Sequence, residues 1–201
     1  MTPFIVPAQP ILRDRPPKGE SWVHEVKFDG YRVQLHKDGK DIAIYSRNGI
    51  DFTSRFPAIA YVLAHLPTRS VIIDAEAVAV TAQGLPNFAA LHRKAGKTED
   101  ICCYAFDLLR HNSVDTRALP LLARRAKLAN LVDRFDNGCL LVSETFFDGE
   151  RLLTECEKRG IEGIVSKRKH APYRSGKCDW IKVKTKAWRE ANKYRGELFN
   201  Q

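Results

Sequence analysis

The segment that most constrains the fold is residues 22–36, where apolar and polar side chains alternate on both sides of Asp29-Gly30. This alternation predicts two β-strands, and Asp-Gly between them is a strong hairpin signal in which Gly30 would supply a positive φ. Lys27 ends the first strand, and Arg32 lies just beyond the turn. A lysine held on a rigid element beside a second cation suits covalent chemistry or phosphate binding.

The rest of the chain alternates between strand-like and helix-like patterns. A turn at residues 37–40 leads into a strand at residues 42–45, which completes an expected antiparallel meander of three strands. Further strands are predicted at residues 71–80, 101–109, 140–143, 161–167 and 179–184, and helices at residues 52–66, 87–94, 118–134 and 149–159. This mixture predicts an α+β fold with largely antiparallel sheets flanked by helices.

Two of the expected helices carry specific predictions about their side chains. Asp51 or Thr53 is positioned to cap the start of the helix at residues 52–66. The helix at residues 118–134 is amphipathic and basic, so its apolar residues are expected to face inward. These inward residues are Leu119, Leu122, Ala126, Leu128 and Leu131.

The chain of 201 residues fits one large domain, and we expect residues 1–201 to form it. Five prolines among the first seventeen residues predict an extended lead-in over residues 1–20. Residues 186–201 are expected to form a short C-terminal tail, in which residues 188–199 can make one helix.

The charge balance points to a polyanionic partner. The chain has 33 Lys and Arg against 24 Asp and Glu, a formal charge of +9, and such a surplus favours nucleic acid. The five cysteines are odd in number and form no Cys-x-x-Cys pair. Together with the lack of a signal peptide or long apolar run, they predict a cytoplasmic protein without membrane association.

Four predicted strands carry ionisable residues among apolar ones. The pairs are Glu25 and Lys27, Asp74 and Glu76, Glu162 and Lys167, and Lys182 and Lys184. Burying an unpaired charge costs several kcal/mol or more, so these groups must meet partners, water or a ligand. Exposed strand faces with salt bridges explain any single pair. Four such strands in a basic protein favour one shared polar cleft.

Six segments, in order, resemble the motifs of the covalent nucleotidyltransferases, which are the polynucleotide ligases and mRNA capping enzymes. Lys27-Phe28-Asp29-Gly30-Tyr31-Arg32 resembles motif I, Ser46-Arg47-Asn48-Gly49 the segment after it in ligases, Asp74-Ala75-Glu76 motif III, residues 104–109 motif IIIa, residues 162–167 motif IV and residues 180–184 motif V. The sequences of these motifs are most similar to those of the ATP-dependent DNA ligases, especially the bacterial ligase domains linked to end-joining repair.

The resemblance implies a central nucleotide cleft in which Lys27 attacks the α-phosphate of ATP. AMP would then pass from Lys27 to the 5′-phosphate of a nick, which is sealed. By the same resemblance, Phe106 would stack on adenine and Glu25 would lie at the adenine amino group. Arg32 and Glu76 would contact the ribose, and Arg47 would lie at the 5′-phosphate side of the nick. The phosphates would be bound by Lys167, Lys182 and Lys184. Glu162, with Glu76 beside it, would bind Mg²⁺ or Mn²⁺.

One expected part of a ligase has no counterpart in the sequence. Ligases normally continue past motif V into an OB-fold, but residues 185–201 are too few for a five-stranded barrel. The expected substrate is nicked double-stranded DNA, and a separate OB-fold or end-joining protein is an expected partner.

Two alternatives to a DNA ligase stay open at this point. An RNA ligase or a capping enzyme would use the same chemistry, although the sequences at residues 74–76 and 105–107 resemble DNA ligases more. A catalytically weak nucleic-acid-binding module would explain the charge. Plain binding, however, does not require Lys27, Glu162, Lys182 and Lys184 together.

Overall fold

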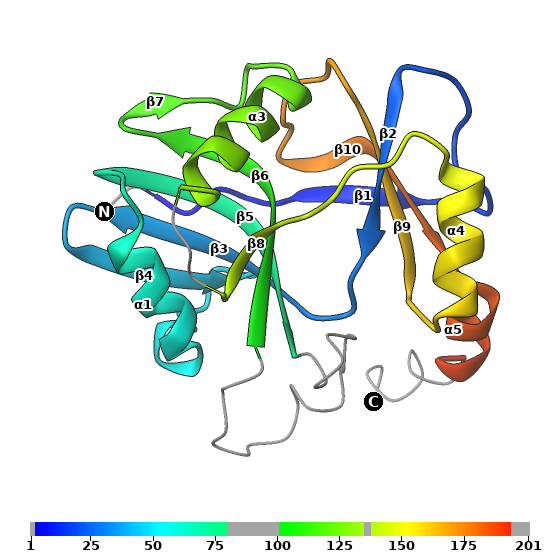
Figure 1. The fold of residues 1–201 in the computed structure, drawn as a ribbon, viewed down its shortest axis with the longest axis horizontal. Coiled ribbons are helices and arrows are strands. Elements are labelled where there is room, and N and C mark those ends of the chain that lie inside the picture. Colours follow the sequence, from blue (N-terminus) through cyan, green and yellow to red (C-terminus); the bar gives the residue numbers. More distant parts are fainter. Residues whose placement is uncertain (1–2, 80–100, 135–137, 194–201) are drawn as a thin grey trace.

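The structure is a computed structural model that describes residues 3–79, 101–134 and 138–193. Two β-sheets form its frame (Figure 1). The smaller sheet has the strand order β1 (Ala8–Leu12), β10 (Gly176–Lys184), β9 (Gly163–Arg168) and β2 (Trp22–Lys27). The larger has the order β4 (Asp41–Ser46), β3 (Tyr31–Asp38), β5 (Ser70–Ala79), β6 (Ile101–His111) and β7 (Val114–Asp115), and β8 (Leu140–Val142) pairs with β6.

Helices flank both sheets. The 3₁₀ turn η1 (Thr53–Arg55) and helix α1 (Pro57–His65) lie beside β3 and β4, and α3 (Leu121–Val132) packs on β6 and β8. Helix α4 (Gly149–Lys158) packs on β9 and β2, and α5 (Lys186–Ala191) follows β10 (Figure 1). The expected α+β class with largely antiparallel pairing is confirmed, with parallel pairs only at β1–β10 and β6–β8 among the described strands. The helix expected at residues 87–94 lies outside the described residues.

The hairpin expected across Asp29-Gly30 is wrong. β2 pairs with β9, whereas β3 pairs with β4 and β5, so the chain passes from one sheet to the other within residues 28–30. Gly30 does not have a positive φ. A Cβ at Gly30 would lie 2.3 Å from the carbonyl oxygen of Ala77, so this glycine is needed for close approach to β5. The next expected turn is confirmed, because β3 and β4 form an antiparallel hairpin.

The Pro-rich lead-in contains a strand that the sequence did not reveal. β1 runs parallel to β10, with a register shift between Gln9 and Ile11 around Pro10. Proline cannot donate a ladder hydrogen bond, and it is tolerated here because β1 is an edge strand with an irregularity at this point. The segment is extended, as expected, but it also belongs to the smaller sheet.

The largest hydrophobic core lies between the larger sheet and helices α1 and α3, with Leu35, Leu63 and Leu128 fully buried. The expected inward face of α3 is partly wrong, because Leu122 and Ala126 are exposed and Leu119 precedes the helix. Arg124 and Arg125 are buried instead. This face meets polar groups of the sheet as well as the core. No helix in the described ranges is long and apolar enough to cross a membrane.

The expected cap of the first helix is also wrong. α1 begins at Pro57 without a side-chain cap. Asp51 instead accepts a hydrogen bond from the backbone N–H of Thr53 at 2.8 Å, at the start of η1. Proline at the first helical turn needs no N–H partner, so the helix can start without a polar cap.

Candidate active site

A cleft of about 540 Å³ is lined by residues of both sheets. The expected site residues that line it are Glu25, Lys27, Arg32, Arg47, Glu76, Phe106, Glu162, Lys167 and Lys184. Lys182 is not among the lining residues, although it lies on the same side of β10 as Lys184. The sequence prediction of one shared polar cleft is therefore confirmed for six of the eight ionisable strand residues, and not for Asp74 and Lys182.

Lys27 and Lys184 share the carboxylate of Glu162. The Lys27 amine lies 2.6 Å from Oε2, and the Lys184 amine lies 3.2 Å from Oε1. Strand pairing explains this meeting, because Gly163 is the register partner of both Lys27 on β2 and Lys184 on β10. Glu162 precedes Gly163 directly, so its side chain is held between the two lysines. The Glu162 side chain is only 3% exposed, whereas both amines are accessible from the cleft.

A cluster of cations surrounds this ion pair. Burial lowers the pKa of Lys182, and the charges of Lys27, Lys184 and Arg47 lower it further. These cations are close enough to repel one another, and Glu162 compensates only part of their charge. The arrangement is suited to binding a polyanion such as a triphosphate.

Glu76 reaches the same cleft from β5 of the larger sheet. Its carboxylate accepts a hydrogen bond from the backbone N–H of Gly30 at 3.1 Å. Burial raises the pKa of Glu76 to about 7, and the charge of Glu162 adds to this rise against the opposing effects of Lys27 and Arg32. The carboxylates of Glu76 and Glu162 are close enough to interact electrostatically in one cleft. They form an oxygen donor set that fits Mg²⁺, which commonly uses one or two protein carboxylates together with phosphate oxygens.

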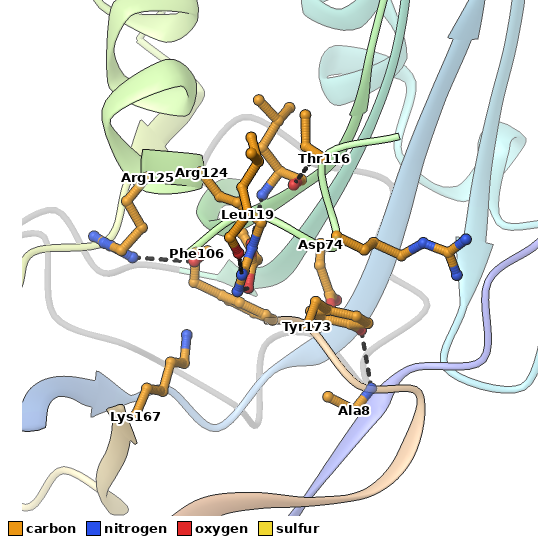
Figure 2. A network of polar contacts seen from close by, with 12 residues as sticks. Ala8, Asp74, Phe106, Thr116, Leu119, Arg124, Arg125, Lys167 and Tyr173 are labelled. Carbon is orange, nitrogen blue, oxygen red and sulfur yellow. Dashed lines mark hydrogen bonds and ion pairs between the residues drawn. The ribbon is translucent and has the colours of Figure 1, made fainter. Parts of the chain in front are cut away.

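Arg32 is fixed on Asp74 and on strand β1. Its guanidinium donates to both carboxylate oxygens of Asp74, at 3.0 and 2.7 Å, and also to the carbonyl oxygen of Ala8. Burial alone would lower the pKa of Arg32, but Asp74 raises it above its usual value. The Tyr173 hydroxyl donates to Asp74 at 2.7 Å and accepts from the N–H of Ala8 at 2.9 Å (Figure 2). Asp74 therefore anchors Arg32 and does not itself line the cleft.

Glu25 and Lys167 meet deeper in the cleft, away from Lys27. The Lys167 amine lies 2.9 Å from Glu25 Oε2, and 4.5 and 4.3 Å from the ring centroids of Phe106 and Trp180. Burial lowers the pKa of Lys167, and the nearby charge of Glu25 opposes this effect. We expected Lys167 to face the phosphates. Its amine is instead bonded to Glu25 and enclosed by aromatic rings. The register explains this position, because Lys167 pairs with Val23 on β2, two residues before Glu25.

Arg125 of α3 is a site residue that the sequence did not reveal. Its guanidinium donates to the carbonyl oxygen of Phe106 at 3.0 Å (Figure 2). It also donates to Glu25 Oε1 at 3.1 Å and to the carbonyl oxygen of Ser143. It thereby ties β2 of the smaller sheet to β6 of the larger. In the sequence, arginines on an amphipathic helix indicate a solvated face, and no signal marked this one as buried.

The neighbouring Arg124 forms a fully buried ion pair. It donates to both oxygens of Asp107 at 2.6 and 2.8 Å, and to the carbonyl oxygens of Leu119 and Ala171 at 2.6 and 3.1 Å. Burial raises the pKa of Asp107 and the bonds from Arg124 oppose this rise. Asp107 thus supports the wall behind Phe106 and does not enter the cleft.

The comparisons with known proteins agree with this geometry. The family described as "ATP dependent DNA ligase domain" matches residues 12–184. The multifunctional non-homologous end joining protein LigD of Pseudomonas aeruginosa is 37% identical over 188 residues, which cover 92% of this chain. A probable DNA ligase of Mycobacterium sp. (strain KMS) is 33% identical over 83% of this chain. The ligase domain of LigD from M. tuberculosis superposes with a TM-score of 0.77 at 29% identity over 90% of this chain.

This chain corresponds to only part of each of these proteins. It covers 22% of the Pseudomonas LigD, 34% of the mycobacterial probable ligase and 60% of the M. tuberculosis ligase-domain chain. A mycobacterial DNA ligase D structure in complex with ATP and MES superposes equally well, with a TM-score of 0.75 at 28% identity over 90% of this chain and 60% of that one. The match spans all the motif residues and both sheets, and this chain belongs to the ATP-dependent DNA ligase domain family.

Proposed function

We propose that this chain is the nucleotidyl-transfer unit of an ATP-dependent DNA ligase that acts in DNA repair. The observation that carries the proposal is the Lys27 amine, held 2.6 Å from Glu162 at the mouth of a cleft with Lys184 on the other carboxylate oxygen. A lysine in this setting is restrained, accessible and surrounded by groups that bind phosphate. Simple nucleic-acid binding does not call for such an arrangement.

The first step of the proposed reaction is nucleophilic attack by Lys27 on the α-phosphorus of ATP. A bond forms between Nζ and phosphorus, and the bond from phosphorus to the bridging oxygen of the β-phosphate breaks, so pyrophosphate leaves. The amine must lose its proton to attack, and Glu162 is within hydrogen-bond distance to accept it. Lys184 and Lys182 lie where they can offset the charge of the reacting phosphates.

The AMP group then passes to DNA in two further steps. The 5′-phosphate of a nick displaces Lys27 from phosphorus, which regenerates the amine. The adjacent 3′-hydroxyl next attacks the activated 5′-phosphate, a phosphodiester bond forms, and AMP leaves. The positive cluster around Lys27 supports both steps, because each passes through a phosphorus centre with developing negative charge.

Glu162 and Glu76 are the residues that would hold Mg²⁺ or Mn²⁺. Such an ion supplies charge neutralisation at the phosphate oxygens. The residues of the chain prepare the position in two ways. Lys27 and Lys184 hold the Glu162 carboxylate in one orientation, and the N–H of Gly30 holds that of Glu76.

The inner end of the cleft is suited to a purine base. Phe106 offers an aromatic face, and the Glu25 carboxylate offers acceptors to an amino group. Arg125 and Lys167 hold that carboxylate. Adenine, with an amino group at C6, therefore suits this end better than guanine, which has a carbonyl at C6.

The likeness to an end-joining protein and the net charge of +9 support nicked double-stranded DNA as the substrate. A separate OB-fold or end-joining protein is proposed as a partner that contributes further contacts with the DNA. The five cysteines, all among the described residues, are thiols and not disulfides, which fits a reducing, cytoplasmic setting.

The experiment that tests the proposal is incubation with ATP labelled at the α-phosphate and Mg²⁺, followed by denaturing electrophoresis. The expected result is a labelled band with the wild-type chain and none with Lys27→Ala or with labelled GTP. If no band forms, sealing of a nick that already carries 5′-AMP is measured next, because this step needs neither ATP nor an adduct. Failure of both reactions with a folded chain would overturn the proposal.

A further inference from the structure

Helix α5, which follows β10, is fixed against the rest of the chain through its first four residues. The hydroxyl of Thr185 accepts a hydrogen bond from the N–H of Trp188 at 3.4 Å. Glu157 of α4 accepts from the first two backbone N–H groups of α5 at 2.8 and 2.9 Å. Arg189 is bonded to Asp14 at 3.2 Å. These contacts set the direction in which the side chain of Trp188 points.

The Trp188 ring lines the cleft beside the phosphate-binding lysines. The Lys184 amine lies 3.6 Å from its centroid, while the same amine is 3.2 Å from Glu162. A cation over the face of an indole is attracted by the ring electrons. The aromatic face and the carboxylate together restrain an ammonium group that otherwise moves freely on a four-carbon stem.

We propose that Trp188 is a positioning residue for Lys184, whose ammonium it holds beside Glu162 so that ATP meets a restrained cation. The inference rests on the proposed function of the cleft as an ATP site. An unrestrained lysine would lose conformational freedom when the phosphates bind, and that loss weakens binding. Trp188 reduces this loss because the amine is already restrained in the free protein.

A purely structural role does not account for this tryptophan. No residue of α5 is buried, and Trp188 belongs to none of the hydrophobic clusters in the described part of the chain. Its removal therefore leaves the core intact. The cleft function of Trp188 can thus be tested without unfolding the protein.

The test begins with Trp188→Leu and Trp188→Phe. Binding of a non-hydrolysable ATP analogue is measured at equilibrium, together with the rate of lysyl-AMP formation over a range of ATP concentrations. We expect Trp188→Leu to weaken analogue binding roughly tenfold, which corresponds to a cation–π contact in a partly dry site. Trp188→Phe should recover most of it. Tyr61→Leu removes an exposed aromatic of α1 as the matched control, and thermal unfolding is followed for every variant.

Two further variants separate positioning from packing. In a Lys184→Met background, Trp188→Leu should cause no additional loss, because the ring acts through the lysine. Glu157→Ala removes an anchor of α5 outside the cleft and should weaken analogue binding in the same direction. Unchanged binding in folded Trp188→Leu, or losses that simply add to those of Lys184→Met, would overturn the inference. A folded wild-type chain that neither binds the analogue nor forms an adduct, and also fails to seal a nick that already carries 5′-AMP, would instead overturn the proposed function.

Discussion

The amine of Lys27 and the carboxylate of Glu162 lie 2.6 Å apart although 135 positions separate them in the chain. Antiparallel pairing of β2 with β9 brings them together, since Lys27 and Gly163 are register partners. Glu162 also binds Lys184, so one carboxylate orders two cations of the cleft.

Glu162→Gln should slow lysyl-AMP formation about a hundredfold or more, the scale of a lost proton acceptor. The amide keeps the shape of the side chain but neither neutralises the two lysines nor accepts the Lys27 proton. Single-turnover labelling with ATP measures the rate. Glu155→Gln, on the exposed face of α4, is the matched control and should react like the wild type. An unchanged rate in Glu162→Gln would exclude the carboxylate from the step.

Glu76 should make folding stability depend on pH. Burial raises its pKa to about 7 from 4.5, so the folded protein retains a proton that the unfolded chain releases. The unfolding free energy should therefore fall as pH rises from about 4.5 to 7 and then level off. Because the side chain is partly exposed in the cleft, we expect this decrease to be about 1–2 kcal/mol. Denaturant titrations at several pH values across this range should show the decrease in unfolding free energy for the wild type and not for Glu76→Gln. The same pH dependence of the unfolding free energy in both proteins would contradict a raised pKa of Glu76.

Arg125→Met should weaken both the fold and the nucleobase end of the cleft. The substitution leaves the carbonyl oxygens of Phe106 and Ser143 without this donor and deprives Glu25 of one of its two cations. Breaking a buried pair of this kind costs about 3–5 kcal/mol. Urea unfolding measures that loss. Competition between ATP and GTP for the cleft should show reduced discrimination, whereas unaltered discrimination would remove Arg125 from base recognition.

Gly30→Ala should disturb the active site although it adds only a methyl group. The new Cβ would lie 2.3 Å from the carbonyl oxygen of Ala77 and must push residues 28–30 away from β5. Overpacking of this kind costs about 1–3 kcal/mol. Adduct formation should fall more steeply than stability, because Lys27 and Glu76 both depend on this contact. Normal labelling with normal stability would show that the segment can yield.

The motif residues were predictable because their types and order are local properties of the sequence. Lys27, Glu162 and Lys184 interrupt apolar strands, and ions in such places need partners. The division of β2 and β3 between two sheets was not predictable, because Asp29-Gly30 has the composition of a hairpin. Its real requirement is close approach to Ala77, which is a tertiary property.

Contacts that depend on the packing of distant elements were also missed. Arg125 looks like a solvated helix residue until α3 is placed on β6, and only then does it meet Glu25. Lys167 is the last residue of motif IV in the sequence, but the pairing of β9 with β2 places its amine beside Glu25. Trp188 lies beyond the last motif, and only the folding of α5 beside β10 brings its ring to Lys184.

The short passage from β2 to β3 limits how the cleft can open. Four peptide units separate the Cα atoms of Lys27 and Tyr31, so these ends of the two sheets can never be more than roughly 14 Å apart. Lys27 therefore stays within this distance of the larger sheet however the two sheets move, which keeps the nucleophile near Glu76 on β5.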